Sequence, residues 1–291
     1  MVIKMNFFLC RYKELGHGIE PDSIKLNPAI RVNTLKVSEK ELLKRLEKKV
    51  KLTKIPFTDS GYWVESDFAL SSTPEYLHGY FYIQEAASQL PVKALSPSDE
   101  DAVLDMCAAP GSKTTQLAQF MGNKGSIVAL ESNSSRLAAL KNNLERCGVT
   151  DCIIYQKDAA HADDLGILFD RVLLDAPCSG NFVTDPGWFE KRSIEGIKLM
   201  AKTQKEILRA ALRVLKPSGT LVYSTCSLEP EEDEEVIEWA LDTFPVKLVE
   251  TGIEVGDSGI TDRTKLCKRF WPEKTGTQGF FIAKMKLKHE N

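Results

Sequence analysis

Two cysteines stand where a thiol could do chemistry. Cys178 lies in a Pro-Cys-Ser-Gly string and Cys226 in a Ser-Thr-Cys-Ser string, each at the end of an apolar run. This position places both thiols at the carboxyl ends of the strands, where substrates bind in open α/β sheets, and not in the apolar middle of a strand. Two thiols at one such edge suggest nucleophilic catalysis. Either cysteine considered alone is as readily explained by inert packing.

Three acidic residues also end apolar runs: Glu131, Asp158 and Asp175. The carboxyl ends of parallel strands face one crevice, so these side chains should converge there. Glu131 stands about 20 residues beyond the glycine of a small-residue turn, where an acid can accept hydrogen bonds from ribose hydroxyls. The alternative is that such acids cap the helix that follows each strand.

The small-residue turn is Cys-Ala-Ala-Pro-Gly-Ser-Lys, residues 107–113. It joins the first strand of the expected sheet to a helix. Small residues allow a ligand to approach the backbone, and the open N–H groups of a helix start favour an anionic or polar group. The turn matches neither GxGxxG nor the P-loop spacing. It predicts a nucleotide-type site, with a plain tight turn as the alternative.

An alternation of strands and helices is expected to position these residues. The expected strands are 103–108, 126–131, 152–158, 171–176, 220–226, 246–250 and 280–287. The expected helices are 113–121, 134–147, 194–215 and 231–243. Near-continuous apolar strands separated by helices predict an α/β fold with a sheet covered on both faces. The helix-poor stretch before the seventh strand predicts that this last strand is reversed on a mostly parallel sheet.

The pattern before residue 96 differs. Short β-like runs at 30–35, 51–57 and 61–65 accompany a basic helix, which Ser38 and Glu41 begin with the spacing of a capping box. We therefore expect a small N-terminal α+β module at residues 1–95 and the larger domain at residues 96–291. The boundary falls in a Ser-Pro-Ser turn.

Composition excludes several classes of protein. With 43% hydrophobic and 27% charged residues, the chain is neither fibrous nor disordered. Its apolar runs are far shorter than a membrane span, and its start lacks a signal-peptide pattern, so a cytoplasmic location is expected. The seven cysteines include no CxxC pair and no matching histidine spacing. This argues against a disulfide framework and against a metal site.

Charge is segregated along the chain. The net charge of −3 disfavours a nucleic-acid partner, but residues 1–54 carry thirteen Lys/Arg against six Asp/Glu, and residues 191–216 carry eight against two. Residues 229–242 carry eight acids and no base. Such asymmetry is typical of a nucleic-acid binder, although solvated helix faces would explain it equally well. The acidic run at 229–238 is predicted to be an ordinary helix N-terminus.

Five ordered strings carry a family resemblance from about Arg31 to the C-terminus. They are YIQEAASQLP, DMCAAPGSKT, DAPCSG, LKPSGTLVYSTCS and GFFIAKM, beginning at residues 82, 105, 175, 215 and 279. The chain resembles the Nop/Sun family of RNA cytosine-5 methyltransferases. The resemblance implies a Rossmann-like methyltransferase sheet and S-adenosyl-L-methionine as cofactor.

The resemblance also implies roles for the cofactor-site residues. The turn that wraps the methionine and ribose end of the cofactor comprises Cys107, Ala108, Ala109, Pro110, Gly111, Ser112 and Lys113. Glu131 takes the ribose hydroxyls with Arg136 close by, Asp158 binds the adenine amine, and Asp175 closes the site. The family usually has glycine where this chain has Ser112, and a serine fits there only with a negative φ.

The catalytic roles follow from the same resemblance. Cys226 is expected to attack C6 of cytosine, and Cys178 to assist proton removal or product release. Asp175 would hydrogen-bond the base, while Lys113 is a candidate for favouring the thiolate. The expected substrate is tRNA, with rRNA as the runner-up and a non-catalytic RNA-binding assembly factor as a further alternative.

RNA recognition is expected from three parts of the chain: the N-terminal module and the basic stretches 191–216 and 263–274. Four aromatic residues could stack on bases, although a place in the core is the more common fate of such side chains. These residues are Tyr80, Phe81, Trp188 and Trp271.

Overall fold

The computed structural model describes residues 6–288, and its larger sheet has nine strands. The strands run in the order β11-β12-β13-β9-β8-β5-β6-β7, and β10 pairs with β13. Strands β5 to β9 are parallel, whereas β13 is antiparallel to β9. Their bounds are β5 Ala102–Asp105, β6 Ser126–Glu131, β7 Cys152–Gln156, β8 Phe169–Asp175, β9 Leu215–Thr225, β10 Val246–Leu248, β11 Asp257–Ser258, β12 Lys268–Phe270 and β13 Phe280–Leu287.

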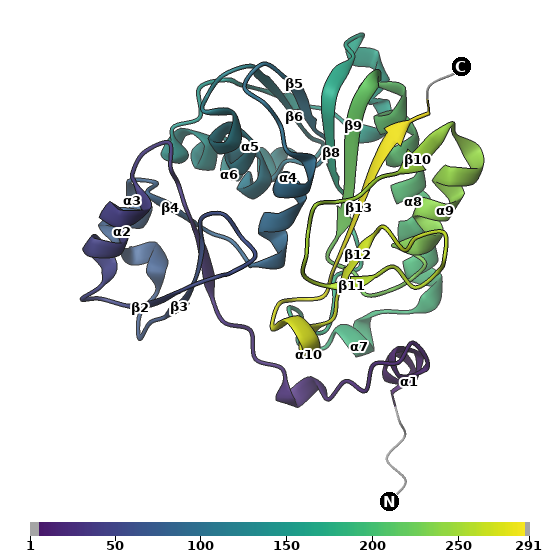
Figure 1. Cartoon of the computed structure of the whole chain (residues 1–291), viewed down its shortest axis with the longest axis horizontal. Coiled ribbons are helices and arrows are strands. Elements are labelled where there is room, and N and C mark those ends of the chain that lie inside the picture. The colour runs from purple at the N-terminus through teal and green to yellow at the C-terminus, as the bar shows by residue number, and fades with distance from the viewer. Residues whose placement is uncertain (1–5, 289–291) are drawn as a thin grey trace, which may run out of the picture.

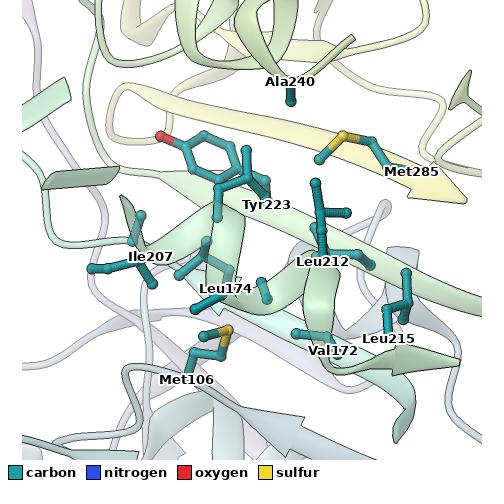
Figure 2. Packing of buried hydrophobic residues seen from close by; sticks show 14 of the residues in the cluster. Met106, Val172, Leu174, Ile207, Leu212, Leu215, Tyr223, Ala240 and Met285 are labelled. Carbon is teal, nitrogen blue, oxygen red and sulfur yellow. The ribbon is translucent and has the colours of Figure 1, made fainter. Parts of the chain in front are cut away.

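Helices cover both faces of this sheet (Figure 1). Their bounds are α4 Leu90–Leu95, α5 Ser112–Met121, α6 Ser134–Cys147, α7 Trp188–Lys191, α8 Ile194–Arg213, α9 Glu234–Thr243 and α10 Pro272–Thr275. On one face, α8 and α9 pack against β8, β9 and β13, and Figure 2 shows side chains of this cluster such as Leu174, Leu212 and Met285. On the other face, α4 and α5 pack against the same strands. Two covered faces explain why the central strands are apolar throughout.

The expected fold is confirmed: the sheet is mostly parallel and its last strand is reversed. All seven expected strands are present, with ends shifted by a few residues. The structure adds β11 and β12, which come from the stretch that sequence patterns describe only as helix-poor. These strands are two and three residues long and have too little alternation to be recognised.

The N-terminal module is a four-stranded antiparallel sheet with two short helices. Its bounds are β1 Ala29–Val32, α2 Glu39–Leu46, β2 Lys51–Lys54, β3 Gly61–Glu65, α3 Pro74–Leu77 and β4 Phe81–Ile83, in the sheet order β2-β3-β1-β4. The expected cap is present, because Ser38 Oγ accepts a hydrogen bond from the backbone N–H of Glu41. The division at residues 95 and 96 stays a prediction.

The segment before this module packs against the larger domain. Helix α1 (Phe7–Glu14) lies beside α7 and α10, far from the N-terminal sheet (Figure 1). Its Phe8 and Tyr12 are buried against Trp188 and Trp271. The chain then continues from the larger domain to β1 of the N-terminal module.

Candidate active site

A cavity of about 410 Å³ opens at the carboxyl ends of the parallel strands, where small residues and acids follow the apolar runs. Eight of the predicted site residues line it: Cys107, Ala109, Glu131, Arg136, Asp158, Asp175, Cys178 and Cys226. The remaining predicted residues, which do not line the cavity, are Ala108, Pro110, Gly111, Ser112 and Lys113. The structure thus brings together side chains that are up to 119 positions apart in the sequence, from Cys107 to Cys226.

The turn between β5 and α5 has the backbone that its residue types predict. Gly111 adopts φ +103°, which a residue with a Cβ rarely adopts. Ser112 is the first residue of α5 and is not among the residues with positive φ. The serine therefore meets the condition set by the sequence. Arg136 supports the turn by donating a hydrogen bond from its guanidinium to the Ala109 carbonyl oxygen.

Glu131 and Asp158 line the cavity, and both also have local partners. Glu131 accepts the backbone N–H of Asn133 at 2.8 Å and pairs with Arg136 at 3.3 Å. Asp158 accepts the N–H of Ala160 at 2.9 Å and so caps the following short helix. Capping and ligand binding are therefore compatible, because a carboxylate has several acceptor positions.

Asp175 is held from two sides at the end of β8. Lys113 Nζ lies 2.7 Å from its Oδ2, and Ser224 Oγ donates to its Oδ1 at 2.8 Å. Lys113 is buried and also donates to Ser88 Oγ at 3.0 Å. The charge of Lys113 therefore acts first on the carboxylate of Asp175.

The two cysteines meet at the cavity wall. Their sulfur atoms lie 2.8 Å apart, and either can donate the hydrogen bond. This contact with Cys226, together with burial, holds the pKa of Cys178 well above its ordinary value. At this distance one thiol can donate its S–H to the other as a thiolate, so the two cysteines ionise as a coupled pair.

Sequence patterns overlook Asp105 at the end of β5. Its side chain is buried, one oxygen accepts from Thr114 Oγ1 at 2.7 Å, and Oδ1 has no hydrogen-bond partner among the described residues. Burial raises its pKa to about 6. The available signal is its place at a strand end, directly before Met106 and Cys107 of the cavity wall.

The acidic run at 229–238 contains the predicted helix N-terminus, because α9 begins at Glu234 with acids in its first turn. Five of its acids are nevertheless buried: Glu229, Glu231, Glu232, Asp233 and Glu234. They are not a solvated helix face. Arg269, whose side chain is 1% exposed, pairs with Asp233 at 3.0 Å and Glu234 at 2.7 Å.

This pairing also removes Arg269 from the predicted RNA-binding stretch 263–274, because a buried and ion-paired guanidinium cannot meet a phosphate. Phe81, Trp188 and Trp271 belong to the core, which excludes them as stacking partners, and Tyr80 is half-buried under Arg45.

The cavity wall fits S-adenosyl-L-methionine. The carboxylates of Glu131, Asp158 and Asp175 line the wall and offer acceptors for ribose hydroxyls and for amino groups. The unpartnered oxygen of Asp105, directly before Met106 of the wall, adds a fourth acceptor.

Among the described residues, no group of three or more His, Cys, Asp or Glu is arranged to hold a metal ion. No helix between residues 6 and 288 combines the length and apolar character that crossing a membrane requires.

Comparison with known proteins decides the family. The family described as 16S rRNA methyltransferase RsmB/F matches residues 92–286, and the N-terminal domain of 16S rRNA methyltransferase RsmF matches residues 21–86. The chain belongs to the RsmB/F methyltransferase family. This confirms the resemblance, since its structural neighbours are of the same NOL1/NOP2/Sun kind.

Relatives and solved structures agree with this family. Ribosomal RNA small subunit methyltransferase F of Vibrio parahaemolyticus is 40% identical over 277 residues, which are 91% of this chain and 58% of the relative. The Salmonella enteritidis protein of the same name is 41% identical over 276 residues, 90% of this chain and 57% of the relative. The chain thus spans somewhat over half the length of these relatives.

Two crystal structures from Pyrococcus horikoshii share the fold. A methyltransferase homologue has a TM-score of 0.85 at 39% identity, covering 99% of this chain and all of that one. NSun6, solved with SFG, has a TM-score of 0.85 at 29% identity and covers 93% of both chains.

Proposed function

We propose that this protein is an S-adenosyl-L-methionine-dependent methyltransferase that modifies cytosine C5 in RNA. The observation that carries the proposal is the pair of thiols 2.8 Å apart on the wall of a cavity whose acids suit the cofactor. A protein that only binds RNA needs neither thiol. SFG is an analogue of this cofactor, and its presence in a related structure supports the same choice.

Cys226 acts as the nucleophile in this proposal. Cytosine C5 is a poor nucleophile, so the Cys226 thiolate adds to C6 and makes C5 enamine-like. The bound cofactor supplies a methyl group on a positively charged sulfur, which is the electrophile for C5. When the C5 proton is removed, the electron pair of that C–H bond reforms the C5–C6 double bond. The C6–S bond breaks, and the thiolate of Cys226 is regenerated.

Asp175 and Cys178 act on protons in the same reaction. Asp175, fixed by Lys113 and Ser224, would hydrogen-bond the base edge and favour protonation at N3, which stabilises the adduct. Cys178 lies against Cys226 and would assist removal of the C5 proton and release of the product. The base must leave its stack to reach these groups.

Small-subunit rRNA is the proposed substrate. The substrate expected from the sequence is tRNA, but the matched relatives are named small-subunit rRNA methyltransferases, which favours rRNA and makes tRNA the alternative. The cytoplasmic location belongs to the same proposal.

Helix α8 offers cations for RNA beside the cavity. Lys198 and Lys202 are exposed, and Lys202 precedes Thr203 of the cavity wall. By contrast, Lys191 and Arg213 pair with Asp185 and Asp163. Exposed cations near the site would hold the phosphate backbone around the flipped base.

Bisulfite sequencing tests the function and the substrate together. The protein is incubated with S-adenosyl-L-methionine and either small-subunit rRNA or tRNA, and cytosines that resist conversion are mapped. We expect one or a few protected cytosines in rRNA and none with Cys226→Ala. Protection confined to tRNA would overturn the substrate assignment. Tight RNA binding without protection in either RNA would favour the assembly factor.

A further inference from the structure

Two adjacent carboxylates contact the neighbours of the two catalytic cysteines. Glu232 accepts the backbone N–H of Ser179 at 2.9 Å and the Ser179 hydroxyl at 2.7 Å. Asp233 accepts the hydroxyl of Thr225. Ser179 follows Cys178 and Thr225 precedes Cys226, so one dipeptide holds both thiol-bearing segments.

Glu232 is also linked to the residue that precedes Cys178. Gln204 donates its side-chain N–H to the Pro177 carbonyl oxygen at 2.8 Å and to Glu232 at 3.4 Å. The residues on both sides of Cys178 are therefore tied to one carboxylate. The backbone carbonyl of Glu232 also accepts the hydroxyl of Tyr223 on β9 at 2.6 Å, and that residue belongs to the buried cluster of Figure 2.

The two carboxylates differ in how their charge is compensated. Asp233 shares Arg269 with Glu234 in a buried ion pair. Glu232 is fully buried and is satisfied by the N–H and O–H donors of the Cys178 segment. A buried carboxylate is costly unless such donors satisfy it, and the same donors are thereby fixed in place. The free-energy cost of burying Glu232 is therefore offset by hydrogen bonds that fix the Cys178 segment.

We infer that Glu232 is a positioning residue that holds Cys178 against Cys226 for the release step. This inference rests on the proposed function, in which Cys178 assists removal of the C5 proton. Glu232 does not line the cavity and so acts through Ser179 and Cys178. Without it, Cys226 can still add to the base, but the thiol that completes the reaction is displaced.

The test compares Glu232→Gln with Glu235→Gln, an exposed glutamate three residues further on, in the first turn of α9. A glutamine offers one acceptor oxygen, and its amide N–H₂ cannot accept the second Ser179 donor. We measure methyl transfer to RNA and the fraction of protein in a gel-stable RNA adduct. For Glu232→Gln we expect turnover to fall about tenfold or more, with the adduct accumulating, because a charge-assisted hydrogen bond is lost. Glu235→Gln should match the unmodified protein.

Several results would overturn the inference. Turnover and adduct levels equal to those of Glu235→Gln would do so, as would loss of the adduct with cofactor affinity retained. If Glu232→Gln fails to fold, Ser179→Ala decides, since it removes one hydroxyl donor: adduct accumulation supports the inference and unchanged kinetics contradict it. The proposed function itself fails if the unmodified protein transfers no methyl group to RNA and the Cys178→Ala variant forms no RNA adduct.

Discussion

At the scale of single residues, the site depends on where charge is buried. Burial raises the pKa of Glu85 and Asp105 to about 6 and that of Glu229 to about 7, and it also raises the pKa of Glu232 and Asp233. In each case desolvation is the largest cause. Glu229 accepts the Tyr12 hydroxyl at 2.6 Å, and its second oxygen lies 3.5 Å from the Arg11 guanidinium without a hydrogen-bond partner among the described residues. Its proton is therefore part of the folded structure below neutral pH.

This predicts a pH dependence of stability that Glu229→Gln removes. Between the ordinary pKa of 4.5 and about 7, the folded protein binds a proton at Glu229 that the unfolded chain has lost. The contribution of Glu229 to stability is thus fully present below pH 4.5 and is lost as the pH rises to 7, by at most about 3 kcal/mol. Urea unfolding at several pH values measures it. The free energy of unfolding of Glu229→Gln should rise relative to the unmodified protein from pH 5 to 7; parallel curves would contradict this.

At the scale of elements, the β5–α5 turn is the part of the site most sensitive to backbone geometry. Gly111 has φ +103°, and a Cβ there would lie 3.1 Å from Leu140 Cδ1. Gly122, at the other end of α5, has φ +64° and open space around its Cβ position. Gly111 lies in the turn at the cavity with a φ outside the left-handed region that other residues adopt, whereas Gly122 lies inside that region and does not line the cavity.

Gly111→Ala is therefore expected to weaken cofactor binding about tenfold, because an alanine in this conformation costs about 1–2 kcal/mol and the turn shifts to relieve it. Gly122→Ala should cost stability but leave cofactor affinity unchanged. Isothermal titration with S-adenosyl-L-methionine compares the two variants. Equal affinities would mean that the turn does not shape the cofactor site.

At the scale of the whole molecule, α1 connects the start of the chain to the buried acids. Arg11 forms an ion pair with Glu231 at 2.7 Å, and the Tyr12 hydroxyl donates a hydrogen bond to Glu229. The segment before the N-terminal module thus closes over the acidic run that supports the cysteines. Arg31 links the module itself to the cofactor turn, since it donates to the Ser112 carbonyl oxygen at 2.8 Å.

The sequence predicts the parts of the site that follow from a parallel sheet. Glu131, Asp158, Asp175 and the two cysteines converge because the carboxyl ends of parallel strands share one edge. The roles of Glu232 and Asp233 could not be predicted. Their burial depends on Arg269, 36 residues beyond Asp233, and on Ser179, 53 residues before Glu232, and no local periodicity contains such pairings.

In the proposed reaction, Cys226 bonds to the base and Cys178 assists its release. The direct measurement is the amount of RNA–protein adduct that survives denaturing electrophoresis, with RNA and cofactor present, for Cys226→Ala and Cys178→Ala. We expect no adduct with Cys226→Ala and a trapped adduct with Cys178→Ala. An adduct that forms as readily without Cys226 would contradict this and exchange the roles of the two thiols.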